Sequence, residues 1–431
     1  MRKIQVGLLG LGTVGMGVYK LLRKRAETMD KTIGAQLEIK KNLVHNKNKK
    51  REGVDETLLT DDWKEIIEDD EIQIVIEVIG GIEPAKTMIL EALKAGKNVV
   101  SANKDLIAEE GKEIFDTAQA AGKDFLFEAA VAGGIPIIRP LKQCLAGNDL
   151  TDILGIVNGT TNYILTKMFE DGMEFSDALK KAQELGYAEA DPTKDVEGYD
   201  AMYKLSILAS MAFHVRLPIE HILREGISTI TKDDIAAAKE LGMEIKLLAI
   251  GKREGEHVEL RVHPTMIPNT HPLAGVKGSF NAIMVHGSAV DDVMFYGRGA
   301  GDLPTASAVV SDIVYSTRTK EHRYMTFMNE QKKLSPTLVF NTDWRTGCYM
   351  RMIVWDKPGT MAKIASIIGD NGINLTSVLQ KDTDGEKANI VFMVKNAHEN
   401  ALQKAIREIA ALEEVVEVSN VIRVETFEKD R

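Results

Sequence analysis

The segment from Leu185 to Ala212 concentrates the side chains that could do chemistry. It holds an acidic loop followed by a lone basic residue on a predicted helix, and the candidates are Glu189, Asp195, Asp200 and Lys204. Pro192 forces a turn before the helix, because the residue before a proline is pushed out of helical geometry. Helical spacing begins at about Glu197, so we expect Asp200 and Lys204 to lie on one face and in contact.

Lys204 shares its predicted helix face with apolar residues, namely Ala201, Ile207, Leu208 and Met211. A solvated surface pair is the ordinary interpretation of an Asp and a Lys at this spacing, because such pairs are common and weak. A pair on the core-facing stripe is different, since burying an ammonium group is costly even when it is paired. A lysine tuned by a carboxylate can exchange a proton with a carbonyl oxygen. The segment therefore predicts a pocket for a small molecule that bears an ammonium and a carbonyl or hydroxyl group.

Composition restricts the class of protein. The chain has 431 residues, a length that suggests about three domains. With 44% hydrophobic and 27% charged residues it is typical of soluble globular proteins, and no run approaches the roughly 18 apolar residues of a membrane span. The net charge of −10 argues against a nucleic-acid partner. The N-terminus lacks a signal-peptide cleavage pattern, and Cys144 and Cys348 lie far apart, so we expect free thiols in a cytoplasmic protein.

A glycine-rich motif follows the first predicted strand, Ile4 to Leu9, and precedes helical spacing at Val18, Leu21 and Leu22. Its glycines are Gly10, Gly12 and Gly15. Strand, glycines and helix in this order are what a dinucleotide-binding fingerprint requires: a tight turn, a close backbone approach to the pyrophosphate, and a helix N-terminus aimed at negative charge. The alternative is a glycine-rich turn without a ligand.

The second predicted strand, about Leu37 to His45, should end near the adenosine ribose, where NAD-preferring folds commonly carry an acid. This chain instead has amides and bases from Asn46 to Arg51. The missing acid and the clustered bases fit a 2′-phosphate, so NADP(H) is favoured, with NAD(H) as the alternative cofactor. Each individual lysine could equally belong to a solvated loop.

Further buried strands are predicted at Ile72 to Ile79, Asn98 to Val100 and Phe125 to Glu128. Lys104 follows the second of these and is a candidate pocket residue, because the carboxyl ends of the strands line the crevice of a doubly wound sheet. After the third, small residues run from Ala129 to Pro136. Such backbone can turn carbonyl oxygens inward and, with one carboxylate, suits a monovalent cation better than zinc.

The pattern changes after about Leu141. A strand from Thr151 to Val157 leads into Asn158-Gly159-Thr160-Thr161-Asn162-Tyr163, a turn that could bind a substrate carboxylate or simply cap a helix. Alternating segments at Glu256 to Val262 and Ala282 to Ala289 indicate a sheet packed by helices. A second glycine-rich loop, Tyr296 to Thr305, precedes a helix and could close over the cofactor.

Polar, poorly periodic residues from Lys320 to Cys348 predict a linker. The pattern beyond it is βαββαβ, which makes a small separate domain. The expected elements are a strand at 349–354, a helix at 359–371, strands at 373–379 and 388–394, a helix at 399–411 and a strand at 415–424.

Taken together these segments resemble the homoserine dehydrogenase family over essentially the whole chain. The matching motifs are GLLGLGTVG, VIEVIGG, SANKDLIA, FEAAVAGGIPIIRPL, GIVNGTTNYILTKM, AQELGYAEADPTKDVEGYDAMYKL and YGRGAGDLPTASAVVSD. The tail, DKPGTMAKIASIIGDNGINL, resembles an ACT domain, a small-ligand regulatory module. No aspartokinase-like region precedes the fingerprint, so the resemblance is to the monofunctional form.

The resemblance implies NAD(P)-dependent, reversible reduction of L-aspartate 4-semialdehyde to L-homoserine, a step towards threonine, methionine and isoleucine. Lys204 matches the proton donor and Lys104 a second active-site lysine. Residues that match the substrate pocket are Glu189, Asp200, Asp195, Gly159, Thr160 and Tyr187. Residues that match cofactor contacts are Gly10, Gly12, Thr13, Val14, Gly15, Lys104, Gly186 and Gly301. A sodium site is implied at Glu128, Val131, Gly133 and Ile135.

The expected fold class is α/β, with three domains: a Rossmann-type dinucleotide-binding domain at 1–135 with a return segment at about 300–320, an α+β catalytic and dimerisation domain at 136–300, and an ACT domain at 348–431 after a linker at 321–347. A homodimer or homotetramer is expected, with an amino-acid effector, threonine, at the ACT domain. The rival functions are another ACT-tailed NAD(P)-dependent dehydrogenase of amino-acid metabolism and a non-catalytic cofactor-binding sensor. Tyr203 and Arg298 depart from the arginine and proline of many relatives.

Overall fold

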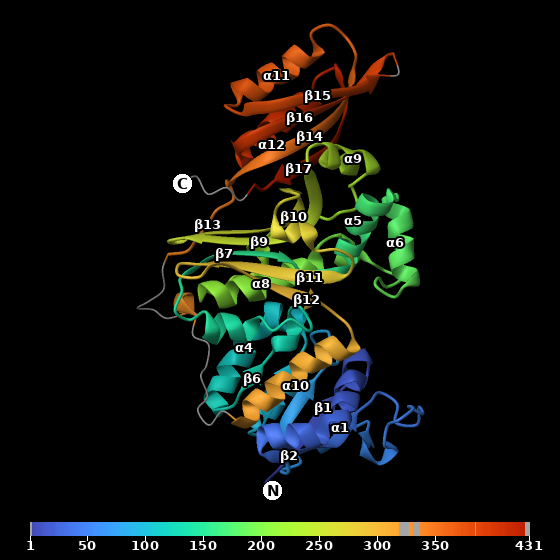
Figure 1. Ribbon diagram of the computed structural model, residues 1–431. Helices are drawn as coiled ribbons and strands as arrows, with labels where there is room; N and C mark the ends of the chain where they lie inside the picture. Colours follow the sequence, from blue (N-terminus) through green and yellow to red (C-terminus); the bar gives the residue numbers. More distant parts are fainter. Residues whose placement is uncertain (1, 319–326, 331–336, 384, 427–431) are drawn as a thin grey trace. The chain divides into compact units, whose positions relative to one another are not determined.

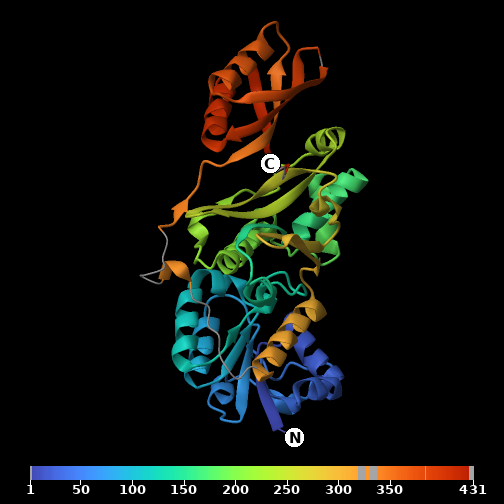
Figure 2. The ribbon, with the colours of Figure 1, turned by 60° about the vertical axis from the view of Figure 1, so that its left-hand side comes forward.

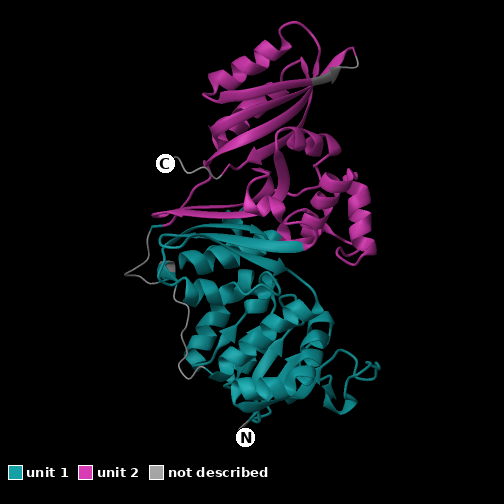
Figure 3. Ribbon diagram, viewed as in Figure 1, with its two compact units in different colours: residues 1–157, 201–222, 280–337 teal, residues 158–200, 223–279, 338–431 magenta. Residues whose placement is uncertain are grey.

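The computed structural model describes residues 2–318, 327–330, 337–383 and 385–426. The chain divides into two compact units, each drawn from several stretches of sequence (Figure 3). Unit 1 comprises residues 1–157, 201–222 and 280–337, and unit 2 comprises residues 158–200, 223–279 and 338–431. The chain therefore passes between the units inside the expected middle domain, residues 136–300, which contributes to both.

A six-stranded parallel sheet begins unit 1. Its strands are β1 (Arg2–Leu9), β2 (Ala35–Leu43), β3 (Leu59–Thr60), β4 (Ile72–Glu77), β5 (Asn98–Ser101) and β6 (Phe125–Leu126). The strand order is β3-β2-β1-β4-β5-β6, and every neighbouring pair is parallel. The order reverses between β1 and β4, which is where doubly wound sheets bind their ligands. The predicted Rossmann-type domain is confirmed.

Helices cover this sheet, and one of them comes from far along the chain. They are α1 (Thr13–Ile33), α2 (Lys64–Ile67), α3 (Ala85–Lys94), α4 (Lys104–Ala121) and α10 (Asp302–Arg318). Figures 1 and 2 both show α10 alongside α1. A Cβ at Gly17 would lie 2.5 Å from the carbonyl oxygen of Asp302, so the glycine permits this close approach. Ala306, Val309 and Ile313 of α10 belong to the same buried core as β1 and α1.

The rest of unit 1 consists of a smaller antiparallel group and helical segments. The strands β7 (Leu150–Ile156), β11 (Phe280–Gly287) and β12 (Asp291–Arg298) pair in the order β12-β11-β7. Helix α8 (Tyr199–Phe213) belongs to unit 1 from Ala201 onwards. Short helical turns are η1 (Glu56–Leu58), η2 (Glu128–Ala130), the π-helical η3 (Pro140–Cys144), η4 (Ile219–His221) and η6 (Met328–Glu330).

Unit 2 contains further helices and a long antiparallel strand pair. Its elements before the C-terminal domain are α5 (Gly159–Asp171), α6 (Phe175–Glu184), α7 (Thr193–Val196), β8 (Leu223–Arg224), α9 (Lys232–Glu240), β9 (Met243–Glu254), β10 (His257–Pro268) and η5 (Pro272–Gly275). Strand β10 pairs antiparallel with β9 along its whole length and parallel with β8. The predicted strand at 256–262 is thus the first half of β10.

The C-terminal domain of unit 2 has the predicted βαββαβ order. Its elements are β14 (Arg345–Trp355), α11 (Thr360–Asp370), β15 (Asn374–Thr383), β16 (Lys387–His398), α12 (Glu399–Ala410) and β17 (Val415–Val424). The antiparallel sheet has the order β17-β14-β16-β15, and both helices lie on one side of it (Figure 2). Ile364, Ile368 and Leu402 carry the helices into the core. Strand β17 also pairs with β10.

Only part of the predicted linker, residues 321–347, can be compared with the structure. Residues 319–326 and 331–336 lie outside the described residues. Within the described remainder, η6 and the short strand β13 (Val339–Phe340) are ordered elements, and β14 begins at Arg345 rather than at the expected Tyr349. The start of β14 was missed because its first residues, Arg345 to Cys348, are polar or small and show no alternation of apolar and polar side chains in the sequence.

Candidate active site

A cavity of about 580 Å³ opens at the carboxyl ends of β1, β2 and β4 in unit 1. The wall residues used below are Gly10, Gly12, His45, Arg51, Asp61 and Trp63. This is the position that the strand order gives a ligand in a doubly wound sheet. Gly10 and Gly12 of the predicted fingerprint therefore line a real crevice.

The glycine loop has the shape that a pyrophosphate needs. Gly10 has φ +103°, and a Cβ at Gly15 would lie 2.1 Å from the carbonyl oxygen of Gly10, so both positions require glycine. A Cβ at Gly12 would meet no heavy atom within 4 Å, so the loop is open there. Helix α1 starts at Thr13 without a side-chain cap, which leaves its first N–H groups for an anion. Thr13 is exposed, and Val14 packs on the core.

The basic run after β2 separates into residues with different surroundings. The Lys47 ammonium pairs with Asp61 at 2.9 Å. The Arg51 guanidinium donates to the carbonyl oxygens of Asn46 and Lys49 at 3.1 and 2.9 Å, and Arg51 lines the cavity. Lys50 is exposed and is not part of the cavity wall. Of the run, Arg51 is thus the base best placed to meet a cofactor.

Lys104 begins α4 beside a buried hydrogen-bond network that the sequence pattern did not predict. Glu77, fully buried at the end of β4, accepts the Ser101 hydroxyl at 2.6 Å and the N–H groups of Ile79 and Gly80 at 2.8 and 3.1 Å. Asn103 caps α4 through the N–H of Leu106, and its amide donates to the Gly81 carbonyl. The network ties the loop after β4 to the residues directly before Lys104.

Lys204 lies on α8 among apolar residues, as predicted. Its side chain and those of Ala201, Ile207, Leu208 and Met211 are all buried. The Lys204 ammonium donates to the carbonyl oxygen of Val157 at 2.8 Å, just beyond the end of β7. This bond fixes the end of a flexible side chain that carries a positive charge.

Asp195 and Asp200 are brought together by a residue whose role the sequence did not reveal. The side-chain amide of Asn158 donates to Asp195 Oδ1 at 2.7 Å and to Asp200 Oδ2 at 2.9 Å. Its carbonyl oxygen accepts the N–H of Thr161 and so caps α5. Asn158 is 5% exposed, and its amide group is fully used. The predicted helix cap is therefore present, and the same side chain also holds two carboxylates side by side.

The other predicted substrate residues lie around α5 and the acidic loop in unit 2. The Thr160 hydroxyl donates to the carbonyl oxygen of Tyr187 at 2.6 Å. The Tyr187 ring packs 5.0 Å from that of Tyr163 and is half exposed. Gly159 is the first residue of α5, Gly186 has φ +74°, and Glu189 is exposed. Asp200 and Lys204 are one turn apart on α8, although they belong to different units.

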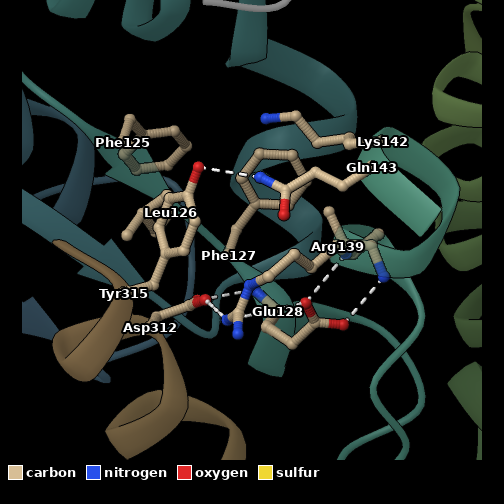
Figure 4. A pocket seen from close by; sticks show the side chains of 10 residues that line it. Phe125, Leu126, Phe127, Glu128, Arg139, Lys142, Gln143, Asp312 and Tyr315 are labelled. Atoms are coloured by element: carbon tan, nitrogen blue, oxygen red, sulfur yellow. Dashed lines mark hydrogen bonds and ion pairs between the residues drawn. The ribbon is translucent and has the colours of Figure 1, made fainter. Parts of the chain in front are cut away.

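The predicted strand from Phe125 to Glu128 is too long. Strand β6 ends at Leu126, and Glu128 is the first residue of the turn η2. Its buried carboxylate accepts the N–H groups of Ile137, Ile138 and Arg139 at 2.5, 2.7 and 2.9 Å. Figure 4 shows Glu128 beside Arg139. The loop that follows has positive φ at Ala132 and Gly133. The Glu128 carboxylate thus accepts three peptide N–H groups, which hold the loop from Val131 to Pro136 closed at its base.

Asp312 on α10 completes this buried cluster. It accepts the N–H of Glu128 at 2.8 Å and pairs with the Arg139 guanidinium at 2.7 Å (Figure 4). Burial, and then the charge of Glu128, raise the pKa of Asp312 to about 7. The sequence signal for this role was an aspartate placed directly before Ile313 in the interior of a helix rich in Ala and Val.

Replacing Asp312 by asparagine should change the pH dependence of stability. A carboxyl group with a raised folded-state pKa stabilises fully below its unfolded pKa of about 4, and this contribution is lost as the pH rises through about 7. The free energy of unfolding of Asp312→Asn, relative to wild type, should therefore increase from pH 5 to pH 8, by up to about 3 kcal/mol. Thermal unfolding at several pH values measures this. Asp149→Asn, at an exposed position, is the control, and a pH-independent difference for Asp312→Asn would contradict the prediction.

The second glycine loop packs against the candidate cation loop inside unit 1. The N–H of Gly134 donates to the carbonyl oxygen of Arg298 at 3.0 Å, and a Cβ at Gly133 would lie 2.4 Å from the carbonyl oxygen of Gly299. Gly301 has φ +125° just before α10. Arg298 stacks on Phe280 at 4.2 Å, which gives this departure from the family a packing role. Within the described residues no cluster of three or more His, Cys, Asp or Glu side chains could hold a metal ion.

Fold and site together define an α/β oxidoreductase with a nicotinamide dinucleotide domain. The family model described as the NAD-binding domain of homoserine dehydrogenase matches residues 10–128, that of homoserine dehydrogenase matches residues 136–314, and that of the ACT domain matches residues 351–414. The homoserine dehydrogenases of Bacillus subtilis and Corynebacterium glutamicum are 41% and 44% identical to this chain, over 99% and 98% of it and 99% and 96% of their own lengths. The chain belongs to the homoserine dehydrogenase family, in the form that carries an ACT domain.

Solved structures agree with this assignment. The crystal structure of a homoserine dehydrogenase from Thiobacillus denitrificans has a TM-score of 0.92 and 42% identity, with 99% of both chains covered. A hyperthermophilic archaeal homoserine dehydrogenase in complex with NADPH has a TM-score of 0.63 and 26% identity, over 74% of this chain and 100% of its own. Among the described residues, no helix is long and apolar enough to cross a membrane.

Proposed function

We propose that this chain interconverts L-homoserine and L-aspartate 4-semialdehyde, with Lys204 as the proton donor and the acidic cluster around Asn158 as the binding site for the substrate ammonium. The observation that carries the proposal is the arrangement along α8. Asp200, held beside Asp195 by the Asn158 amide, stands one turn before the buried Lys204. The reaction is a step in threonine, methionine and isoleucine synthesis.

The dinucleotide, when bound, supplies or accepts the hydride. Lys204 donates a proton to the aldehyde oxygen during reduction and accepts it back during oxidation. Its bond to the Val157 carbonyl orients the ammonium, whose positive charge stabilises the negative charge that develops on the substrate oxygen. Lys104, at the first position of α4, is the second active-site lysine, and it contacts both cofactor and substrate in this proposal.

Substrate recognition is assigned to unit 2. Asp195, Asp200 and Glu189 bind the α-ammonium, because three carboxylates can surround a cation that offers three donors. Gly159, Thr160 and Tyr187 line the pocket beside them. The hydrogen bond from the Thr160 hydroxyl to Tyr187 supports this assignment, because it ties the start of α5 to the acidic loop.

The cofactor site extends over both glycine loops. Gly10, Gly12, Thr13, Val14 and Gly15 hold the pyrophosphate, and Gly186 and Gly301 make further contacts. A sodium ion bound by the backbone carbonyl groups of Glu128, Val131, Gly133 and Ile135 would brace the loop between them. The positive φ values at Ala132 and Gly133 support this, since they let neighbouring carbonyl groups point in different directions.

NADP(H) is the preferred cofactor in this proposal, and Arg51 is the residue that recognises the 2′-phosphate. Arg51→Glu should lower kcat/KM with NADP by roughly 10–100-fold relative to NAD, the size of one lost charge-assisted hydrogen bond. Initial rates with each dinucleotide measure the ratio. Lys50→Glu makes the same change of net charge outside the cavity wall and should alter the ratio little. An equal change of the NADP-to-NAD ratio in both variants would contradict a specific role of Arg51 and would mean that the basic run acts only through its total charge.

One spectrophotometric experiment tests the proposed reaction. Nicotinamide absorbance is followed with L-homoserine and either NADP or NAD, with L-threonine, L-serine and 3-phosphoglycerate as alternative substrates. We expect reduction of the dinucleotide with homoserine alone, faster with NADP, and faster in sodium chloride than in choline chloride. No reduction by folded protein that binds the dinucleotide would contradict the proposal.

Assembly and regulation complete the proposal. We expect a homodimer or homotetramer, supported by half-exposed Met294 and Tyr296 on β12, the end strand of its sheet among the described residues, and tested by light scattering after gel filtration. The ACT domain takes an amino-acid effector, threonine. A cytoplasmic location agrees with the free thiols of Cys144 and Cys348.

A further inference from the structure

The stretch Arg224–Ser228, called here the support segment, lies against the acidic loop that carries Asp195 and Asp200. The N–H of Ile227 donates to the carbonyl oxygen of Val196 at 2.8 Å. The Ser228 hydroxyl donates to Glu197 Oε1, also at 2.8 Å. These bonds fall on the residues directly after Asp195.

Two further features make this contact close. The Arg224 guanidinium donates to the carbonyl oxygen of Glu197 and lies 3.7 Å from the ring of Tyr199. A Cβ at Gly226 would lie 2.6 Å from the carbonyl oxygen of Val196, so no larger residue fits there. The support segment therefore fixes the backbone on both sides of Gly198, between the two substrate carboxylates.

The other side of the support segment is held by the C-terminal domain. Arg423 on β17, 2% exposed, pairs with Glu225 Oε2 at 2.5 Å and with Glu399. Asn420, also on β17, donates to the carbonyl oxygen of Thr229 at 3.0 Å. Arg351 on β14 bonds Thr231 and Asp234 at the start of α9. The C-terminal domain is thus bonded to the support segment at Glu225 and to the residues that follow the segment, up to Asp234.

We propose that Glu225 and Arg423 are positioning residues for the reaction: their ion pair sets the support segment, and through Glu197 and Gly198 it sets the spacing of Asp195 and Asp200. The inference rests on the proposed substrate role of these two carboxylates. It gives the ACT domain a defined mechanical path to the substrate site, because the ion pair of Arg423 joins β17 directly to Glu225 of the support segment. An amino acid bound by the ACT domain would act on substrate affinity by this path.

The test is the variant Glu225→Gln, which keeps the size of the side chain and removes its charge. The KM for homoserine should rise roughly fivefold to tenfold, while kcat and the dissociation constant for NADPH stay within about twofold. This is less than the loss of a buried charge-assisted hydrogen bond would cause, because the Glu225 side chain is 40% exposed. A general loss of structure would instead move all three values. Ser228→Ala breaks the contact with Glu197 from the other side and should raise the same KM about twofold to threefold, without touching β17.

Glu425→Gln is the matched control. Glu425 pairs with Arg261 on β10 at 2.5 Å and is more deeply buried than Glu225, with a side chain 8% rather than 40% exposed. Among the described residues, no hydrogen bond or ion pair of the Glu425 side chain reaches the support segment. An equal rise in KM in Glu425→Gln, or an unchanged KM in Glu225→Gln, would overturn the inference. Asp200→Asn is measured in parallel: an unchanged KM there removes the substrate role of Asp200 and this inference with it. A raised KM in Asp200→Asn with an unchanged KM in Glu225→Gln overturns the inference alone.

Discussion

Replacing Lys204 by methionine is expected to lower kcat for homoserine oxidation about a thousandfold, within the range of positioned general acid–base groups. Methionine keeps an unbranched apolar stem of similar length, so the packing of α8 around Ala201 and Leu208 should survive. What disappears is the ammonium that the Val157 carbonyl orients. The dissociation constant for NADPH should stay within about twofold, because the glycine loop and the cavity at β1 and β4 are untouched.

Three measurements separate this expectation from misfolding. Steady-state rates give kcat, fluorescence titration gives the affinity for NADPH, and thermal unfolding reports the fold. Lys204→Arg keeps a positive charge but moves it, and an arginine does not exchange its proton near neutral pH. Its kcat should therefore lie between those of wild type and Lys204→Met. Lys180→Met, at a position outside the described sites, serves as the neutral control. Near-normal turnover in Lys204→Met would remove Lys204 from the role of proton donor.

The dinucleotide domain could be predicted from sequence because its signals are local. The apolar strand, the glycines and the helix stand next to one another from Arg2 to Ile33, and each constrains its neighbour. The C-terminal domain is similar, since its alternating strands and amphipathic helices pack on one another in chain order. By contrast, nothing local shows that the chain leaves unit 1 at Asn158, returns at Ala201 and crosses between the units three more times. That path is set by long-range packing.

The same distinction applies to the site. Lys204 could be singled out because its own helix surrounds it with apolar residues. Asn158 could be recognised only as a helix cap, because its partners Asp195 and Asp200 are 37 and 42 residues further along the chain. Glu128 was correctly placed beside the loop of small residues. The occupation of its carboxylate by three peptide N–H groups depends on residues up to Arg139 and was not predictable from the motif.

Tyr203 shows how a departure from the family pattern can be explained by the structure. Its hydroxyl donates to Glu109 Oε1 at 2.8 Å and so ties α8 to α4, the helix that starts with Lys104. Burial, and then this hydrogen bond, raise the pKa of Tyr203 to about 12, so the hydroxyl remains a donor at neutral pH. An arginine here would join the same helices by an ion pair. The substitution therefore keeps the link between the two lysine-bearing helices and changes only its charge.

Replacing Asn158 by aspartate should raise the KM for homoserine at least about a hundredfold. The Asn158 NH2 group donates one N–H to Asp195 and one to Asp200. In aspartate a negatively charged oxygen takes the place of this NH2 group and faces both carboxylates. A third carboxylate at hydrogen-bond distance repels each of them by several kcal/mol at an effective dielectric constant of about 20, and even half of one such term exceeds the 2.7 kcal/mol of a hundredfold change. Relief of this repulsion requires movement or protonation, and both remove the paired charge that binds an ammonium.

This change isolates the bridge from the helix cap. Aspartate caps a helix as well as asparagine does, so the bond from the Thr161 N–H and the start of α5 should be kept. Asn158→Ser also keeps a capping oxygen but adds no charge and cannot reach both carboxylates, so its KM should rise only about tenfold. KM measured from pH 6 to pH 9 distinguishes the causes: the defect of Asn158→Asp should deepen as the pH rises, while that of Asn158→Ser should not. Equal, pH-independent defects would mean that Asn158 acts through the helix rather than by holding two charges together.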